Sequence, residues 1–403
     1  MRDSHSPFRA VGPSFLPQKA VLPLKRNLIT FLSYLLVATL AAGAAFVVSS
    51  RSAPGKLAEL ESLIDQRFIG EADVETMEDA AAAAMLSATG DRWSYYVPAS
   101  EYEAHQELMN NTYVGVGITI QEAEEGGFSI VDVTEGAPAQ EAGLQIGDIL
   151  VAVAGESVRE KDSGAVRDLV RGEEGTYVDL TVLRQETEKT FSVERRRVET
   201  VVASGELLEG NIGLVTIRNF DTRCFDETKV AIDALLEEGA KKLIFDVRNN
   251  PGGYANELVK VLDYLLPEGE VFHTVDYRGK ESIDYSDAAC LDVPMVVLVD
   301  GNSYSAAEFF AAALQEYEAA RVVGSRTVGK GYFQSTFRLS DGSAVALSIG
   351  KYYTPKGENL ADVGIVPDVE IDIEDEEKAA QLYYGRLPHE EDPQLQAAIQ
   401  LLK

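Results

Sequence analysis

The second half of the chain alternates short apolar runs with helix-like stretches, and this pattern limits the fold more than any other feature. After residue 199 the apolar runs and helical stretches follow one another from NIGLVTIR to RVVGS. Alternation of apolar runs with helices of roughly 10–15 residues is typical of βα units around a buried, largely parallel sheet. We therefore predict an α/β fold, in which active sites collect where strands meet helices.

Two strand-to-helix junctions carry residues that suit catalysis. The first is DVRNNPGG, residues 246–253, whose glycines open a helix and expose backbone N–H groups that can hold an oxyanion. The second is VDGNSYSAAE, residues 299–308, in which Ser305 lies in the first turn of a helix. Each junction also has a plainer interpretation, because the glycines suit any helix-entry loop and Ser305 suits a helix N-cap.

A lysine fixed between two glycines follows in TVGKGYFQ, residues 327–334. Lys330 can take the proton of a serine nucleophile if desolvation lowers its pKa from about 10.4 toward neutrality. The apolar neighbours in this stretch favour such desolvation. In a straight strand Gln334 would lie roughly 13 Å from Lys330, so Gly331 must bend the chain if the glutamine is to orient the lysine.

The preceding segment has the order of strands and glycine turns of a small β domain. The runs YVGVGITI and AGLQIGD resemble the corresponding parts of a PDZ domain. In that family a glycine-rich loop offers backbone N–H groups to the terminal carboxylate of a peptide. The resemblance implies that the peptide-binding residues are Gly115, Val116, Gly117 and Ile118. Tight turns in an unrelated β domain are the alternative.

Taken together, these motifs resemble the C-terminal processing, or tail-specific, serine peptidases. The resemblance runs from about residue 56 to about residue 371 and also includes DRWSYYVP, KYYTPKG and GIVPD. It implies a βα sandwich-like peptidase core of the ClpP/crotonase kind. It further implies Ser305 as nucleophile, Lys330 as general base, Gln334 as the residue that positions the lysine, and an oxyanion hole from Ala306 with Gly252 or Gly253.

The chain departs from the family around the nucleophile. The usual run is Ser-Ala-Ser-Ala-Ser-Glu, whereas here Tyr304 and Ala307 replace smaller or hydroxylated residues. The three predicted catalytic side chains are present, so activity is compatible with the sequence. The bulky Tyr304 beside Ser305 leaves the shape of the substrate pocket open.

The N-terminal part of the sequence predicts a membrane anchor. Residues 28–48 form an uncharged, apolar run of twenty-one residues, enough to cross a bilayer core of roughly 30 Å. The arm before it carries five basic residues and one acidic residue, so the N-terminus is expected in the cytoplasm and the rest outside it. We predict a single-pass protein of the cell membrane; a signal peptide cleaved near Ala42-Gly43-Ala44 is the alternative.

These signals divide the chain into six parts. We expect a cytoplasmic arm at 1–27, an anchor at 28–48, a helical region at 52–111 that is broken by the turn-like DRWSYYVP, a PDZ domain at 112–195, the peptidase core at 196–371 and an acidic tail at 372–403 that ends in the helix-like PQLQAAIQLLK.

Composition excludes several other functions. With 36 basic and 66 acidic residues the net charge is −30, which disfavours nucleic acid as a partner. Two cysteines, Cys224 and Cys290, are too few for a disulfide framework and leave one bridge or two free thiols open. No Cys/His cluster has the spacing of a zinc site, so we expect neither metal nor cofactor.

Two competing catalytic patterns are weaker. Ser348 and Lys351 fit the Ser-x-x-Lys motif, which needs both residues one helical turn apart, but their surroundings in SAVALSIGKYYT favour a strand. Of the four histidines, only His273 is placed where a His-based triad is conceivable, and a structural role suits it better.

The sequence therefore predicts a membrane-anchored, extracytoplasmic serine endopeptidase whose PDZ module captures substrates by apolar C-terminal tails. A non-catalytic PDZ peptide-binding or scaffold protein on the same fold is the alternative. The expected partners are protein or peptide substrates and the membrane, with a homo-oligomer as a further possibility implied by the resemblance.

Overall fold

The computed structural model describes residues 55–123 and 126–403. The predicted cytoplasmic arm and membrane anchor lie outside these residues. Among the helices described, none is long and apolar enough to cross a membrane. The chain divides into two compact units, of which the first ends at Glu78 and the second runs from Asp79 to Lys403.

The helical period predicted after residue 55 is confirmed by two helices. They are α2, Lys56–Arg67, and α3, Val74–Ser87. Neither helix has a buried residue, and apolar side chains such as Leu57 and Leu60 are about half exposed. A short 3-10 turn and a third helix follow, η1 at Ala99–Glu101 and α4 at Tyr102–Met109.

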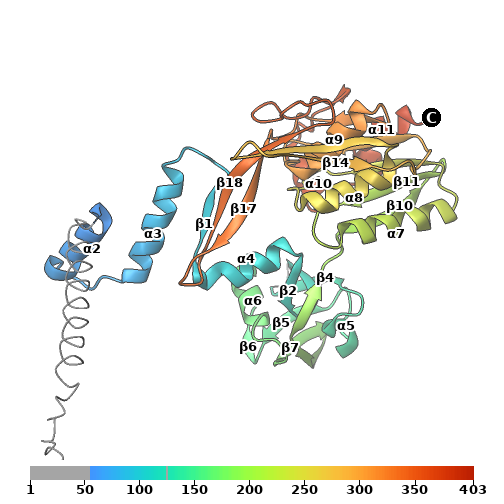
Figure 1. Cartoon of the computed structure of the whole chain (residues 1–403). Helices are drawn as coiled ribbons and strands as arrows, with labels where there is room; N and C mark the ends of the chain where they lie inside the picture. The colour runs from blue at the N-terminus through green and yellow to red at the C-terminus, as the bar shows by residue number, and fades with distance from the viewer. Residues whose placement is uncertain (1–54, 124–125) are drawn as a thin grey trace, which may run out of the picture. The chain divides into compact units, whose positions relative to one another are not determined.

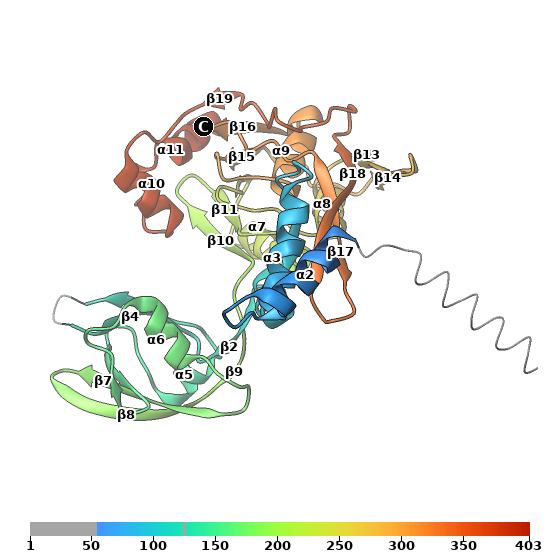
Figure 2. The same cartoon turned by 90° about the vertical axis from the view of Figure 1, so that its left-hand side faces the viewer.

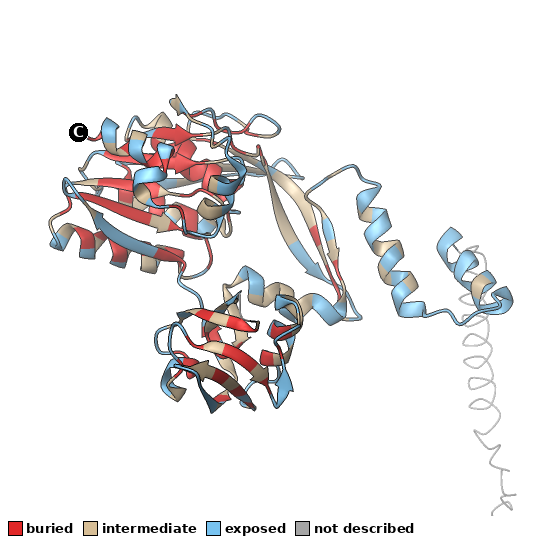
Figure 3. Ribbon diagram, turned by 180° about the vertical axis from the view of Figure 1, so that it is seen from behind, coloured by how far each residue is buried: buried red, intermediate tan, exposed pale blue. Residues whose placement is uncertain are grey.

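The βα alternation forms a six-stranded sheet with helices on both faces (Figure 1). In order across the sheet its strands are β10 Ala203–Leu208, β11 Ile212–Ile217, β12 Lys242–Asp246, β15 Met295–Val299, β16 Ala320–Gly324 and β19 Val369–Glu370. Only the β10–β11 pair is antiparallel. Strand β15, in the middle of the sheet, is buried and apolar throughout because both of its faces are covered. Figure 3 shows the burial of this core.

Residues at alternate positions of these strands belong to two hydrophobic clusters, one on each face of the sheet. Phe245 and Val297 point into the larger cluster, with the helices α7 Cys224–Glu237, α8 Ala255–Leu265 and α9 Ala306–Glu316. Ile244 and Val296 point to the opposite face, which is covered by α11, Pro393–Leu401 (Figure 2). This alternation is the two-residue period expected of a buried strand.

The predicted acidic tail, 372–403, ends in the helix that PQLQAAIQLLK predicts and contains further structure before it. It holds α10 Glu376–Tyr383, the turn η2 His389–Glu391, and α11. Asp392, which caps α11, pairs with the buried Arg248 at 2.8 Å. Leu395, Ala398 and Leu402 are buried against the sheet. The end of the chain is therefore part of the core.

A second, wholly antiparallel sheet adjoins the same helices. Its strands are β1 Tyr95–Val97, β18 Ala344–Tyr353, β13 Gly269–Asp276 and β14 Glu281–Ser286, with β17 Tyr332–Arg338 also on β18. Phe272 of β13 contacts Phe309 of α9 edge to face, so α9 is packed between both sheets. One sequence prediction is corrected here, because the turn-like DRWSYYVP contains the strand β1, which pairs with β18.

The predicted PDZ module is a separate β structure with its own hydrophobic core. Its main sheet comprises β3 Ile118–Glu122, β4 Phe128–Val133, β5 Ile149–Val153, β6 Glu156–Ser157, β7 Tyr177–Arg184 and β8 Thr187–Glu194. The module also has the strand pair β2 Thr112–Gly115 and β9 Arg196–Glu199, and the helices α5 Pro138–Ala142 and α6 Ser163–Val170. Within AGLQIGD, Gly143 ends α5 at φ 93° and Asp148 pairs with Arg184 at 2.6 Å.

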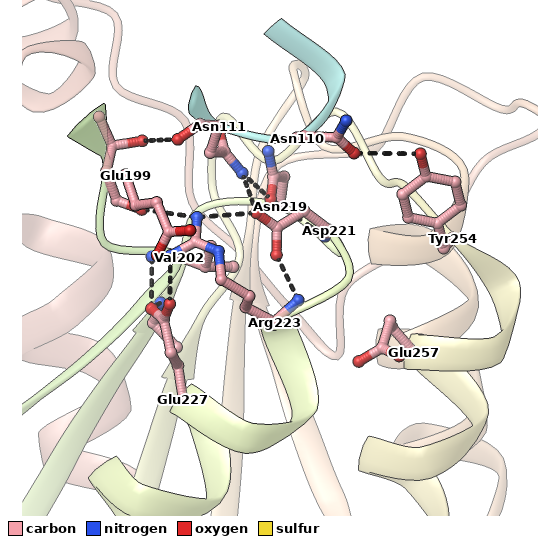
Figure 4. A network of polar contacts seen from close by, with 12 residues as sticks. Asn110, Asn111, Glu199, Val202, Asn219, Asp221, Arg223, Glu227, Tyr254 and Glu257 are labelled. Atoms are coloured by element: carbon pink, nitrogen blue, oxygen red, sulfur yellow. Dashed lines mark hydrogen bonds and ion pairs between the residues drawn. The ribbon is translucent and has the colours of Figure 1, made fainter. Parts of the chain in front are cut away.

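The chain enters this module at Asn111 and leaves it at Thr200. One cluster of polar side chains in the core binds both of these connecting segments (Figure 4). The Asn111 side-chain amide donates to Asp221 at 2.9 Å, and the Thr200 N–H donates to the Asn111 carbonyl at 2.9 Å. Arg223 donates to Asp221 at 3.0 Å and to the Thr200 carbonyl at 2.9 Å. The two linkers therefore begin side by side.

Candidate active site

Ser305 lies at a sharp turn between the buried strand β15 and helix α9. Its backbone has φ 59° and ψ −125°, a positive-φ conformation that side chains rarely adopt. Such strain persists where the surroundings enforce it and is concentrated at functional sites. The residue is 4% exposed and is the N-cap of α9. The two interpretations of Ser305 drawn from the sequence are therefore compatible.

The hydroxyl of the neighbouring Ser303 forms hydrogen bonds within the two junction loops. The Ser303 hydroxyl donates to the Val247 carbonyl at 2.7 Å and accepts from the Asp300 N–H at 3.0 Å. It is completely buried. Ser303 therefore joins the two strand-to-helix junctions. This leaves Ser305 as the candidate nucleophile of the loop.

The glycine loop after β12 comes directly against Ser305. A Cβ added to Gly252 would lie 2.7 Å from Ser305 Cβ and 2.9 Å from the Ala306 nitrogen. Because real Cβ atoms essentially never come so close, only glycine lets the two junctions meet. The buried Asn250 anchors this loop, since its side-chain amide donates to the Ile217 carbonyl at 2.8 Å.

The backbone donors of this loop differ in what they bind. Gly252 N–H donates to Asn250 Oδ1 at 2.8 Å and is therefore used inside the loop. In the part of the chain that the structure describes, Gly253 N–H and Ala306 N–H donate to no protein acceptor. Ala306 N–H belongs to the first turn of α9, where donors have no partner within the helix. Of the two glycines predicted for the oxyanion hole, Gly253 therefore has the unused donor.

A buried carboxylate links the nucleophile loop to the lysine loop. Glu308 Oε2 accepts from Ser305 N–H at 2.9 Å and from Lys330 N–H at 2.8 Å. Its Oε1 accepts from Gly329 N–H at 2.7 Å and from the Thr327 hydroxyl at 2.5 Å. Burial raises the pKa of the Glu308 carboxyl, while these four donors act in the opposite direction. Ser305 and Lys330 are therefore tied to the same carboxylate oxygen.

Lys330 precedes strand β17, and its side chain returns to a residue of that strand. Its Nζ donates to Gln334 Oε1 at 2.9 Å, so the expected contact is formed. A register shift between Phe333 and Gln334 accompanies it. Burial lowers the pKa of Lys330 to about 8, although the charges of Asp91 and Glu308 favour the protonated form. No hydrogen bond joins Lys330 Nζ to Ser305 Oγ among the described residues.

The segment before β1 also reaches this site. The Trp93 carbonyl accepts from Gln334 Nε2, and Lys330 Nζ lies 5.0 Å from the centroid of the Trp93 ring. Tyr304, the departure beside the nucleophile, stacks on Trp93 with ring centroids 5.9 Å apart. The bulk of Tyr304 is therefore directed toward the lysine.

The predicted peptide-binding residues line a separate groove in the PDZ module. This groove has a volume of about 910 Å³, and Gly115, Val116, Gly117 and Ile118 lie along it together with residues of α6. A Cβ on Gly117 would come 2.3 Å from Ala137 Cβ, and its φ is 81°, so glycine is required there.

The competing patterns do not form a second catalytic group. Ser348 and Lys351 lie on strand β18, as their surroundings predict, and not on a helix. His273 lies on β13, where its ring packs against Tyr353. Both cysteines are free, Cys224 buried and Cys290 exposed. Within residues 55–123 and 126–403, no group of three His, Cys, Asp or Glu side chains is placed to hold a metal ion.

Three residues of the site were missed at the level of sequence. Glu308 follows Ser305 by three positions, the spacing of a helix capping box, and that signal could have identified it. Asn250 and Trp93 gave no such signal, because their partners Ile217 and Gln334 are distant in the sequence.

Comparison with known proteins agrees with the two folded domains described above. Residues 211–371 match peptidase family S41, and residues 129–184 match the PDZ domain. Ser305, Lys330 and Gln334 all lie within the S41 match. The chain thus contains an S41 peptidase domain and a PDZ domain, and the resemblance to C-terminal processing peptidases predicted from the sequence is confirmed.

Two sequence relatives and one solved structure are similar to most of this chain. A "Probable CtpA-like serine protease" of Staphylococcus epidermidis is 32% identical over 320 residues, which cover 78% of this chain and 65% of that protein. The Staphylococcus aureus protein of the same name is 32% identical over 79% of this chain and 64% of its own length. The chain thus spans about 65% of the length of these relatives. A solved S41-type protease structure from Bacteroides fragilis has 17% identity, a TM-score of 0.53, and coverage of 82% of this chain and 90% of that one, which shows a shared fold.

Proposed function

We propose that this protein is a membrane-anchored serine endopeptidase of the C-terminal processing type, with its catalytic part outside the cytoplasm. The observation that carries the proposal is the linkage of Ser305 and Lys330. The backbone N–H groups of both residues bind one oxygen of the buried Glu308, and the lysine has a pKa lowered to about 8. A lysine with such a pKa is partly neutral near physiological pH and can act as a base.

In the proposed reaction, neutral Lys330 accepts the hydroxyl proton of Ser305 while Ser305 Oγ bonds to the carbonyl carbon of the substrate. The tetrahedral intermediate collapses as the lysine ammonium gives that proton to the leaving amine and the C–N bond breaks. Water then attacks the acyl-enzyme, its proton passes through Lys330 to Ser305, and the new carboxylic acid leaves. Gln334 holds Lys330 in place before substrate binds, and catalytic hydrogen bonds often form fully only in the substrate complex.

The negative oxygen of the intermediate is assigned to the backbone N–H groups of Ala306 and Gly253. Both groups are unused by the described residues, and Ala306 is the first residue of α9, whose helix dipole favours negative charge. Gly252 has a different role in this proposal, because its N–H is bound to Asn250 and its missing side chain makes room for Ser305.

The PDZ groove is proposed to capture substrates by an apolar C-terminal tail. Backbone N–H groups of Gly115–Ile118 would bind the terminal carboxylate while the tail adds as a strand beside β3. The uncharged run at 28–48 and its basic flank support attachment to the membrane with the N-terminus in the cytoplasm.

The decisive experiment is cleavage of an unfolded reporter with an apolar C-terminus by the full chain in detergent, beside Ser305→Ala and Lys330→Ala. We expect turnover in the parent chain and none in either variant, with normal circular dichroism in all three. Turnover that survives in Ser305→Ala would refute the mechanism. Peptide binding without turnover in the parent chain, and without labelling of Ser305 by a serine-reactive phosphonate, would favour a non-catalytic binding protein.

A further inference from the structure

Two aromatic rings from distant parts of the sequence cover the side chain of Lys330. Trp93 precedes β1, and Tyr304 precedes the nucleophile Ser305. Their rings stack with an interplanar angle of 28°. Lys330 Nζ lies 5.0 Å from the Trp93 centroid and 5.9 Å from the Tyr304 centroid. Two ring faces are thus within contact range of one ammonium group.

The backbone of the Trp93 segment is fixed on both sides. Trp93 N–H donates to Asp91 Oδ1 at 3.0 Å, and Ser94 Oγ accepts from the Ser348 N–H of β18 at 3.0 Å. Strand β1 then pairs with β18 over three residues. Arg92 extends to the Val328 carbonyl at 3.5 Å, which lies in the loop that carries Lys330. The segment that carries the Trp93 ring is therefore held by hydrogen bonds on both sides of this residue.

The Trp93 carbonyl has a second effect on the site. It accepts from the Gln334 side-chain amide, so the Nε2 end of that amide is directed away from the lysine. The other end, Oε1, accepts from Lys330 Nζ at 2.9 Å. An amide that donates at one end and accepts at the other has a fixed orientation. The Trp93 carbonyl therefore determines that Gln334 directs its amide oxygen toward Lys330.

We propose that Trp93 is a positioning residue for Lys330, whose indole excludes water from the amine and whose carbonyl orients Gln334. The active site of this peptidase is then completed by a segment that precedes the PDZ module, more than a hundred residues before the S41 match begins at residue 211. This inference rests on the proposed role of Lys330 as the base.

Charged groups around the lysine decide the direction of the expected effect. The carboxylates of Asp91 and Glu308 favour the protonated amine, and yet burial holds its pKa at about 8. The guanidinium carbon of Arg92 lies 4.3 Å from the centroid of the same Trp93 ring and adds a positive charge nearby. A ring face attracts a cation, but withdrawing an ammonium from water is the larger effect. Removing the indole should therefore raise the pKa of Lys330.

The test measures the pKa of Lys330 without any turnover. The full chain in detergent, carrying Ser305→Ala, is labelled with a trace amine-reactive reagent across pH 6–11, and the modification of Lys330 is followed by mass spectrometry. We expect a midpoint near 8 in this parent, in agreement with the burial of the amine. In Trp93→Ala the midpoint should rise by about one pH unit, which means about tenfold less neutral lysine at pH 7. Trp93→Ala keeps the carbonyl, so the change isolates the ring.

Controls separate the ring from a general loosening of the segment. Trp93→Phe retains an aromatic face and should keep the midpoint near 8. Tyr96→Phe removes a hydroxyl of β1 that donates to Asp79 at 2.6 Å and should leave the midpoint unchanged. Tyr304→Ala, which removes the other ring, should raise the midpoint and provides the test if Trp93→Ala does not fold.

The outcomes are distinct from those of the proposed function. An unchanged or lowered midpoint in folded Trp93→Ala, or in Tyr304→Ala if the former does not fold, overturns the inference whether or not the enzyme turns over. With Ser305 restored, Trp93→Ala should lose about tenfold in kcat/KM at pH 7 and recover most of it by pH 9.5. An equal loss at all pH values would mean a merely structural role. If the chain with Ser305 and Trp93 intact shows neither turnover nor labelling of Ser305 by a serine-reactive phosphonate, the proposed function is refuted, and the pKa measured for Lys330 still stands.

Discussion

The burial of Lys330 should make the protein less stable than it would be without this charge. The pKa of the lysine falls from its ordinary value of 10.5 to about 8 in the folded chain. At 1.36 kcal/mol for each pKa unit, the folded state is destabilised by about 3 kcal/mol at pH 7, where most of the amine is protonated in both states. Lys330→Met keeps the length and removes the charge. It also removes the hydrogen bond to Gln334, which is worth about 1 kcal/mol.

We therefore expect Lys330→Met to be inactive and more stable than the parent chain by about 2 kcal/mol at pH 7. Above pH 8 the folded parent loses its proton while the unfolded chain keeps its own up to about pH 10.5. Because the unfolded state then binds more protons, the stability of the parent rises relative to that of the variant. The advantage of the variant should thus shrink across this window and disappear by its upper end.

Urea unfolding of the full chain in detergent between pH 6.5 and 10.5 measures this difference. Titration of all other groups is common to both proteins and cancels in the comparison. The control is Lys351→Met, which changes an exposed lysine of strand β18 and should have little effect on stability at any pH. A Met variant that is less stable than the parent at pH 7, or an advantage independent of pH, would refute the assignment of Lys330 as a desolvated base.

Three further predictions concern other residues. Glu308→Ala leaves four donors without their acceptor and should reduce the free energy of unfolding by about 3–5 kcal/mol, as measured by urea unfolding. Gly252→Ala should reduce kcat/KM at least a hundredfold, because its Cβ would displace Ser305; Gly279→Ala has a similar positive φ in open space and should retain activity. Gly117→Ala should weaken binding of a tail peptide at least tenfold by fluorescence polarisation, whereas Gly155→Ala, with φ 80° and no neighbour within 4 Å, should not.

Much of the peptidase core could be predicted from the sequence because its signals are local. Apolar runs such as MVVLV and helical periods such as that of α9 depend only on neighbouring residues. The same is true of the glycines near Ser305, since a tight approach demands glycine whatever the partner. Ser305, Lys330 and Gln334 came from motifs, and the structure brings them together in one site.

The parts that were not predicted depend on contacts between distant segments. Strand β1 has three residues and forms only because β18 lies beside it, so DRWSYYVP read as a turn. The helix-like PQLQAAIQLLK predicted α11, but the acidic composition of residues 372–403 did not indicate that this helix covers one face of the sheet with only a few apolar residues. The polar contact of Arg248 with Asp392 joins residues 144 positions apart, and the sequence around neither residue predicts it.

The adjacent linkers of the PDZ module have a consequence for how such enzymes can be remodelled. Asn111 and Thr200 are joined by a main-chain hydrogen bond of 2.9 Å, so the module begins and ends at nearly one point of the core. A domain whose ends meet in this way can be inserted or exchanged without stretching its host. Joining the two linkers by a short turn would give a minimal enzyme that keeps the Trp93 segment in the same chain as Ser305. In the proposed function, peptide recognition and hydrolysis therefore belong to separable parts of the chain. A different peptide-binding domain grafted at the same junction should then redirect the proposed peptidase.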